Sequence, residues 1–257
     1  MRLRSPTWVA LAILLAGPTP ARAADDTRAS ADTFVVRTAH LAHQTCAYAV
    51  WLPPGYTKTR VWPAMVFLHG SGECGTDGLA PTRIGLGPAL IAHPERWPCI
   101  VIFPQKPRED VEWEERESED LLLAILDRAE RELPVDRHRV ALVGMSQGGH
   151  GVWVIGARHP ERWTCLVPVC AYGRARTVSP RVARLPVWAF HGLLDDRVDP
   201  RDTREIVEGI RVQRAKLGLD SSATRMTLYP GANHNAWDSA FGDPELAKWI
   251  LSQAPTR

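Results

Sequence analysis

Short apolar runs recur along the chain from residue 33 onward. Two runs rich in strand-forming residues come first, at Thr33–Thr38 and Gln44–Trp51, and a Pro-Pro-Gly turn follows the second. Five near-continuous apolar runs and a weaker strand-like run come next, at 64–70, 99–105, 139–144, 165–170, 186–192 and 225–229. Runs without polar alternation are typical of strands that are buried on both faces. We therefore expect a sheet that is covered on both sides.

Helical patterning fills the intervals between these runs. The interval at Ser118–Glu132 has one apolar stripe with charges opposite, formed by Leu121, Leu122, Ile125, Leu126 and Ala129. The other predicted helices cover Pro88–His93, Gln147–His159, Arg201–Leu217 and Pro244–Gln253. Strands that alternate with helices after an antiparallel start predict an α/β fold with a mostly parallel sheet. The ligand site of such a sheet lies at the carboxyl ends of its strands.

The first 23 residues have the pattern of a cleaved secretory signal. Arg2 and Arg4 precede an apolar run from Trp8 to Ala16, and small residues stand at Ala21 and Ala23. The apolar run is too short to span a membrane, and no cysteine follows that would indicate a lipid anchor. A buried or anchoring N-terminal helix is the alternative. We expect an exported protein, periplasmic or extracellular.

Removal of this segment changes the charge balance. The expected organisation is a signal peptide over 1–23, a flexible leader over 24–32 and a single domain over 33–257. Residues 1–23 contain three of the 31 basic residues and none of the 29 acidic ones, which leaves a net charge of about −1. With 45% hydrophobic residues the chain has enough apolar material for one core. We expect no surface for nucleic acid or for an anionic membrane.

Cysteine and histidine spacing gives no metal or cofactor signal. Export would permit disulfides, but the five cysteines are odd in number and no pairing can be assigned. Cys165 and Cys170 are too far apart along a strand to bond each other. We expect most cysteines to be buried as small apolar side chains. "HLAH" at 40–43 has the spacing of a metal pair but lacks a third ligand, so no metal site and no cofactor are expected.

The sequence "GMSQG" at 144–148 contains the strongest chemical signal. It matches G-x-S-x-G, directly after an apolar strand and directly before a helix. Glycines two positions before and after Ser146 fit a tight strand-to-helix turn that exposes a serine hydroxyl. The backbone N–H of Gln147 then lies at a helix N-terminus, where an anion is favoured.

A serine nucleophile needs a base, and chain order selects it. In G-x-S-x-G hydrolases the acid follows the serine and the histidine follows the acid. His191 precedes every aspartate of "HGLLDDRVDP" at 191–200, so we expect it to be structural. His234, in the loop after the 225–229 run, follows those aspartates and is the predicted base.

The acid must leave the strand at 186–192 and reach this histidine. Asp195 and Asp196 are both close enough, and the residues alone leave the choice between them open. Asp199 precedes a proline and a predicted helix, so we expect it to be a helix cap.

A glycine-rich loop at 68–78, "LHGSGECGTDG", supplies the second donor for an oxyanion. The donor is the N–H of Ser71 or Gly72. Gly72, Trp237 and Trp113 are candidates for the wall of an acyl or aromatic pocket. Glu73 and Asp77 either brace this loop or are solvated. The acidic run at 109–120 is interpreted as a solvated loop and a helix start, not as a glycosidase pair.

Four segments together resemble a known family. "LHGSGE.GTD", "GMSQGGHG.W......HPERW", "PVWAFHG..D..V" and "YPG..HN.WD" are similar to bacterial α/β-hydrolases described as predicted peptidases. That group is related to carboxylesterase/phospholipase and dienelactone hydrolase groups. The resemblance implies an α/β-hydrolase fold and Asp195 as the acid, with Ser146 as nucleophile and His234 as base. It also implies Ser71 and Gln147 as the oxyanion donors.

Two residues depart from the pattern of that family. Gln147 stands where methionine is common, which keeps the backbone donor and makes the pocket floor more polar. Cys74 stands where a basic residue is usual, so a charge offered to substrates by this loop is in doubt.

The predicted function is that of an exported serine hydrolase. Only fourteen residues, Tyr172 to Leu185, separate two central strands, so no large lid is expected. An open cleft favours short-chain, aryl or polymer-attached esters. The same machinery acting on peptides is the first alternative, and an inactive secreted binding protein is the second. The sequence gives no oligomeric state.

Overall fold

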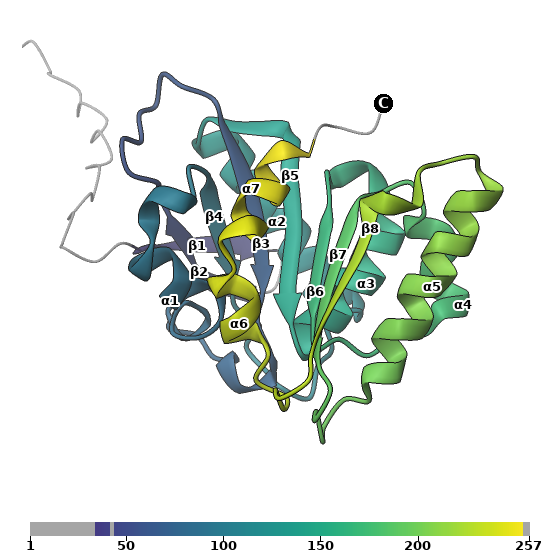
Figure 1. Cartoon of the computed structure of the whole chain (residues 1–257). Coiled ribbons are helices and arrows are strands. Elements are labelled where there is room, and N and C mark those ends of the chain that lie inside the picture. Colours follow the sequence, from purple (N-terminus) through teal and green to yellow (C-terminus); the bar gives the residue numbers. More distant parts are fainter. Residues whose placement is uncertain (1–33, 42–43, 254–257) are drawn as a thin grey trace, which may run out of the picture. The chain divides into compact units, whose positions relative to one another are not determined.

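The computed structural model describes residues 34–41 and 44–253. The predicted signal peptide and leader and one histidine of "HLAH" lie outside these residues. Eight strands form one sheet in the order β1-β2-β4-β3-β5-β6-β7-β8 (Figure 1). Their bounds are β1 Phe34–Leu41, β2 Gln44–Trp51, β3 Trp62–Leu68, β4 Ile100–Pro104, β5 Val135–Met145, β6 Leu166–Val169, β7 Val187–Gly192 and β8 Thr224–Tyr229.

The sheet is antiparallel at its start and parallel afterwards. β2 pairs antiparallel with β1 and with β4, and every later pairing is parallel. β3 shows why such strands have no polar alternation, because both of its faces are covered. Val66 and Leu68 belong to one core cluster and Met65 and Phe67 to the other, all of them at most 1% exposed.

Helices cover both faces of the sheet (Figure 1). Those of the described residues are α1 Leu86–Ala92, α2 Arg116–Glu132, α3 Gln147–Arg158, α4 Ala175–Val182, α5 Pro200–Lys216, α6 Trp237–Gly242 and α7 Pro244–Ser252. The apolar residues of α1, α6 and α7 join one core cluster, and those of α2, α3, α4 and α5 join the other. The predicted α/β architecture with helices on both faces and an antiparallel N-terminal pair is confirmed.

Two helices and the start of one strand are the main differences between the structure and the predicted elements. α4 and α6 were not predicted, because they have only eight and six residues and α4 contains Pro180. β5 begins at Val135, four residues before the predicted run, where Val135 pairs with Trp62 ahead of a register shift. Between β6 and β7 the chain forms only α4, so the expected absence of a large lid there agrees with the structure.

The cysteines and the helices add two facts about the described residues. All five cysteines are free thiols, and only Cys74 is not buried. No helix among residues 34–41 and 44–253 has both the length and the apolar character needed to cross a membrane.

Candidate active site

Ser146 stands in the turn between β5 and α3. Its φ of 54° and ψ of −121° lie in a backbone region that residues other than glycine rarely adopt. Among the described non-glycine residues, only Cys170 also has a positive φ. Ser146 N–H donates to the carbonyl oxygen of Val169 at 2.9 Å, and its own carbonyl accepts from His150 N–H at 3.0 Å. Strain of this kind is maintained by surrounding structure. The turn presents the hydroxyl at the carboxyl edge of the sheet, as the motif predicts.

The two glycines around Ser146 are required by close backbone contacts. A Cβ on Gly144 would lie 2.6 Å from the carbonyl oxygen of Gly148. A Cβ on Gly148 would lie 2.0 Å from the carbonyl oxygen of Leu68 and 2.5 Å from that of His69. Backbone atoms cannot move aside as a flexible side chain can. These glycines therefore let α3 start directly against the end of β3.

A chain of hydrogen bonds links the three residues predicted as a triad. Ser146 Oγ lies 2.9 Å from His234 Nε2, and His234 Nδ1 lies 2.8 Å from Asp195 Oδ2. A carboxylate only accepts, so Nδ1 carries the proton of a neutral His234 ring and leaves Nε2 to accept from the serine. The three residues come from three different loops, after β5, β7 and β8, at the carboxyl ends of parallel strands.

The carboxylate of Asp195 is fully buried and held from several sides. Oδ1 accepts from the N–H groups of Arg197 and Val198 at 2.9 and 3.0 Å, and Oδ2 accepts from His191 Nε2 at 3.0 Å. Burial by itself raises the pKa of Asp195, but the hydrogen bond from His234 and those from the two amides lower it below its ordinary value. Asp195 is therefore ionised at neutral pH.

His191 supports this acid directly. Its ring is fully buried, with Nε2 also 3.1 Å from the carbonyl oxygen of Val198 and Nδ1 2.8 Å from Thr203 Oγ1. Burial lowers the pKa of His191, so the ring is neutral, and Nε2 carries the proton because it faces two acceptors. The sequence suggested a structural histidine, and the structure adds its contact with Asp195.

The neighbouring aspartates have other surroundings. Asp196 is exposed and lies outside the hydrogen-bond chain. Asp199 caps α5 by accepting from Arg201 N–H at 2.9 Å, which confirms the predicted helix cap. Geometry thus separates Asp195 from Asp196, which the residues alone could not do.

Cys170 lies beside the acid and the base. Its sulfur, a carboxylate oxygen of Asp195 and a ring nitrogen of His234 lie within 4.8 Å of one another. Burial raises the pKa of the Cys170 thiol to about 12, so it is protonated at neutral pH, whereas metal ions bind the thiolate. Asp195 and His234 already bond each other. The chemistry of this donor set does not favour a metal ion.

The glycine-rich loop after β3 faces the serine. Ser71 and Gly72, in the short turn Ser71–Glu73, line a cavity of about 460 Å³ together with Ser146, Gln147 and His234. Gln147 is the first residue of α3, so its N–H has no acceptor within the helix. The structure therefore brings the predicted donors Ser71 and Gln147 to the same cavity as the serine.

Gln105, just after β4, braces this loop. Its Nε2 donates to the carbonyl oxygen of Glu73 and to Asp77 Oδ1, both at 3.0 Å, and its Oε1 accepts from Gly78 N–H at 2.6 Å. Asp77 also accepts from the N–H groups of the next turn, at 2.9 and 3.0 Å. Asp77 thus braces the loop and is not merely solvated.

Lys106 is a fully buried cation behind the predicted oxyanion donors. Its Nζ donates to Gln147 Oε1 at 2.7 Å and to the carbonyl oxygen of Val111, and Gln147 Nε2 donates to the carbonyl oxygen of Glu109 at 3.2 Å. Burial lowers the pKa of Lys106. The amide of Gln147 is therefore committed to a buried network. Sequence reasoning missed Gln105 and Lys106, although their place after a buried strand was the available signal.

His69 and Trp113 pack under the same loop. His69 Nε2 accepts from Lys106 N–H at 3.0 Å, and Trp113 Nε1 donates to the carbonyl oxygen of His69 at 3.0 Å. Trp113 is fully buried and lies edge-on to His69, with ring centroids 5.1 Å apart. It does not line the cavity that holds Ser146, so the structure gives it a supporting position and not the suggested place in the pocket wall.

Trp237 and Glu73 complete the wall near the serine. Trp237 packs edge-on against His234 at 5.3 Å, and its buried Nε1 has no hydrogen-bond partner among the described residues. Glu73 Oε2 is likewise buried without a partner, and burial raises the pKa of this carboxyl. Both side chains line the cavity. Trp237 and Gly72 thus both line the cavity that holds Ser146.

The chain is similar to one protein family and to several solved structures. Residues 41–241 match the esterase family, described as "Putative esterase". A thermostable esterase superposes with a TM-score of 0.75 at 25% identity, over 86% of this chain, which spans only 63% of that protein. A mutant feruloyl esterase module from Clostridium thermocellum, complexed with sinapinate, gives 0.66 at 17% identity, over 87% of this chain and 89% of the module. S-formylglutathione hydrolase from Staphylococcus aureus superposes with a TM-score of 0.64 at 13% identity. The match covers 85% of this chain and 98% of that protein.

Proposed function

We propose that this chain, which belongs to the esterase family, hydrolyses ester bonds with Ser146, His234 and Asp195. The observation that carries the proposal is the unbroken hydrogen-bond chain from Asp195 through His234 to Ser146, which ends in an open cavity. The resemblance of the surrounding motifs to α/β-hydrolases supports the same three residues.

The acylation step follows from this geometry. Ser146 Oγ attacks the ester carbonyl carbon while its proton passes to His234 Nε2, 2.9 Å away. Asp195 accepts from Nδ1–H and stabilises the imidazolium that forms. The tetrahedral intermediate then collapses, and His234 gives the proton to the leaving alkoxide. The products are an alcohol and an acyl-enzyme.

Deacylation repeats these roles with water as the nucleophile. His234 takes a proton from water, the hydroxide attacks the acyl carbon, and Ser146 leaves with the proton returned to its Oγ. In both steps the N–H groups of Ser71 and Gln147 hold the negative oxygen. Each such donor lowers the barrier by about 3 kcal/mol in comparable sites.

The cavity favours esters with a compact group at the serine. Its volume of about 460 Å³ is in the range of small-molecule sites, and only α4 lies between β6 and β7. Trp237 offers an aromatic wall beside His234. We propose short-chain, aryl or polymer-attached esters as substrates. The signal pattern in residues 1–23 supports export to the periplasm or beyond the cell.

The test is hydrolysis of 4-nitrophenyl acetate by wild type and Ser146→Ala. We expect wild type to turn over and Ser146→Ala to be inactive while it keeps its circular dichroism spectrum and unfolding midpoint. Ser252→Ala, which changes an exposed serine in α7, is the matched control and should stay active. Undiminished turnover by Ser146→Ala would contradict the proposal.

Two further measurements separate the alternatives. A fluorophosphonate should label wild type and not Ser146→Ala, and absence of labelling in wild type would favour an inactive binding protein. Short peptides should be cleaved far more slowly than aryl esters. A higher kcat/KM on peptides would favour the peptidase alternative with the same residues.

A further inference from the structure

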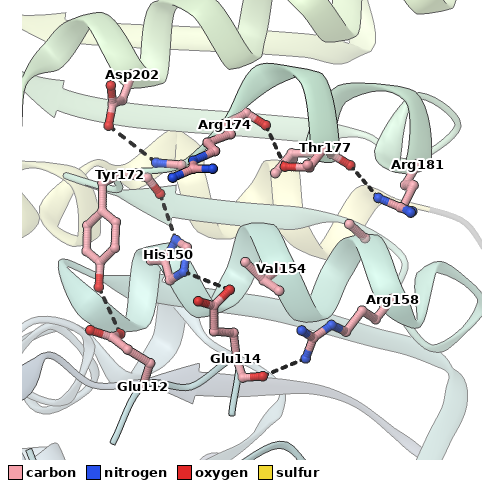
Figure 2. Close-up of a pocket in the computed structure, with 13 residues that line it drawn as sticks. Glu112, Glu114, His150, Val154, Arg158, Tyr172, Arg174, Thr177, Arg181 and Asp202 are labelled. Atoms are coloured by element: carbon pink, nitrogen blue, oxygen red, sulfur yellow. Dashed lines mark hydrogen bonds and ion pairs between the residues drawn. The ribbon is translucent and has the colours of Figure 1, made fainter. Parts of the chain in front are cut away.

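A second and larger cavity adjoins the one that holds Ser146. It has a volume of about 980 Å³, and its wall includes parts of α3, α4 and the loop after β6 (Figure 2). Glu112 and Tyr172 line both cavities, and Tyr172 Oη donates to Glu112 Oε2 at 2.8 Å between them. A substrate held at the serine can therefore extend past this pair into the second cavity.

The wall nearest the serine is ordered by its own contacts. The rings of His150 and Tyr172 stack with centroids 4.3 Å apart and an angle of 8° (Figure 2). His150 Nδ1 lies 3.1 Å from the carbonyl oxygen of Tyr172, and Nε2 lies 3.4 Å from Glu114 Oε2. A wall fixed in this way needs little reorganisation when a ligand binds.

The carboxylates of the cavity are already satisfied by protein groups. Glu112 accepts from Tyr172, and Glu114 lies against His150, as described above. Asp202 Oδ2 accepts from Gly173 N–H at 3.4 Å. The tyrosine hydroxyl and the backbone N–H are neutral donors, so these contacts orient the carboxylates without cancelling their negative charge.

The three arginines that line the second cavity differ in their partners. Arg158 pairs with the carboxylate of Glu119 and donates to the carbonyl oxygen of Glu114. Arg181 donates to the carbonyl oxygen of Thr177 at 2.9 Å and has no carboxylate partner among the described residues. Arg174 makes no side-chain hydrogen bond or ion pair with any described residue. The guanidinium groups of the cavity wall without a carboxylate partner among the described residues are thus Arg174, just before α4, and Arg181 in α4.

The spacing of these two arginines sets the reach of a ligand. Arg174 is the N-cap residue immediately before α4, and Arg181 follows seven residues later in the last turn of that helix. At 1.5 Å per residue they lie about 10 Å apart along the axis. Both line the cavity, so they present cationic groups along its length.

We propose that this second cavity is a substrate subsite that binds a carboxylate carried by the part of the ester remote from the scissile bond, through Arg174 and Arg181. The proposal rests on the proposed ester hydrolysis at Ser146. Guanidinium groups bind carboxylates through paired N–H donors. The remote part of the substrate can be the acyl group or the alcohol, and both are tested below.

The experiment compares matched charged and uncharged esters. For the acyl group, 4-nitrophenyl monoesters of dicarboxylic acids of increasing length are compared with the same compounds capped as methyl esters. For the alcohol, acetylated hydroxybenzoates are compared with their methyl esters. We expect at least a tenfold higher kcat/KM for the carboxylate in one of the two series, reduced by salt because the arginines are exposed.

Variants of α4 assign that preference to residues. Arg174→Gln with Arg181→Gln should bring the ratio of charged to uncharged kcat/KM to within twofold of unity. Arg176→Gln is the matched control, since Arg176 is an exposed arginine of α4 outside the cavity wall, and it should keep the wild-type ratio. Turnover of 4-nitrophenyl acetate should be the same in all of these variants.

The outcomes distinguish the subsite from the function it rests on. Equal kcat/KM for charged and uncharged esters in both series, with 4-nitrophenyl acetate still cleaved, would overturn the subsite alone. A preference that survives in the double variant would also overturn it. Loss of 4-nitrophenyl acetate hydrolysis in wild type would instead contradict the proposed function.

Discussion

Asp195 shows how one carboxylate can be committed to a single orientation. His234, His191 and the N–H groups of Arg197 and Val198 all donate to it. An amide in its place would keep the shape of the side chain but would put an N–H group where only acceptors are tolerated. Such a change alters the protonation of His234 and leaves the packing nearly intact.

We therefore predict that Asp195→Asn lowers kcat for 4-nitrophenyl acetate by about 10⁴-fold, as in other Ser-His-Asp triads. Asp196→Asn is the matched control, because Asp196 is an exposed neighbour outside the hydrogen-bond chain, and its kcat should change less than twofold. Steady-state kinetics at pH 7 to 8 measure both. The reverse ranking would show that Asp196 is the acid.

Lys106 and Gln147 form a buried hydrogen-bonded pair, and a double-mutant cycle can measure what their interaction contributes to stability. Lys106→Met leaves Gln147 Oε1 without its donor, and Gln147→Met removes an acceptor from a buried ammonium. A buried polar group without a partner destabilises the folded state by about 1 to 3 kcal/mol. We predict that the double variant loses less stability than the two single losses together, by a coupling of about 1 to 3 kcal/mol.

Urea unfolding of the four proteins in this cycle measures the coupling. Lys248 is an exposed lysine of α7, so Lys248→Met combined with Gln147→Met gives the control cycle, in which the losses should add. Additivity in the Lys106 cycle as well would show that the 2.7 Å contact does not stabilise the fold.

At the scale of elements, the pattern of apolar and polar residues predicted the long helices and the strands that are buried on both faces. The apolar runs located the strands of the sheet, and the stripe in α2 located that helix. α4 and α6 were not predicted because eight and six residues are too few to show a helical periodicity of apolar positions. The first residues of β5 were not predicted to be a strand. Val135 pairs with Trp62, and both residues lie ahead of the apolar runs of their strands.

Chemistry that depends on contacts between distant segments could not be predicted from the sequence. The order of motifs identified Ser146 and His234, because the turn and the chain order are local facts. Asp195 needed the family resemblance, since only orientation separates it from Asp196. The hydrogen bond of Lys106 with Gln147 spans 41 residues, and no pattern within either segment encodes it. The stack of His150 on Tyr172 was hidden for the same reason.

The junction of β3, β5 and α3 is the tightest contact between elements around the serine. A methyl group on Gly148 would overlap the carbonyl oxygens of Leu68, the last residue of β3, and of His69, which follows it. We predict that Gly148→Ala destabilises the protein by about 3 kcal/mol or more, because backbone on both sides must move. Gly242→Ala, with no atom within 4 Å of the added carbon, should change stability by less than about 0.5 kcal/mol. Urea midpoints test both, and equal effects would contradict the packing argument.

At the scale of the whole molecule, two neutral histidines couple folding to pH. His69 and His191 are both fully buried, one after β3 and one in β7. Burial lowers the pKa of His69 to about 3 and also lowers that of His191. In the unfolded chain each ring has a pKa near 6.5. Between these values the unfolded state binds protons that the folded state does not.

Stability should therefore fall as the pH falls below about 6.5, since unfolding takes up protons there. For His69 alone, the free energy of unfolding should drop by about 2 kcal/mol between pH 7 and pH 5. We predict that His69→Asn, although less stable at pH 7, loses about that much less over the same interval. His138→Asn changes an exposed histidine and should keep the wild-type dependence. Urea unfolding at pH 7, 6 and 5 gives the three slopes, and an unchanged slope in His69→Asn would mean that the folded protein already protonates this ring.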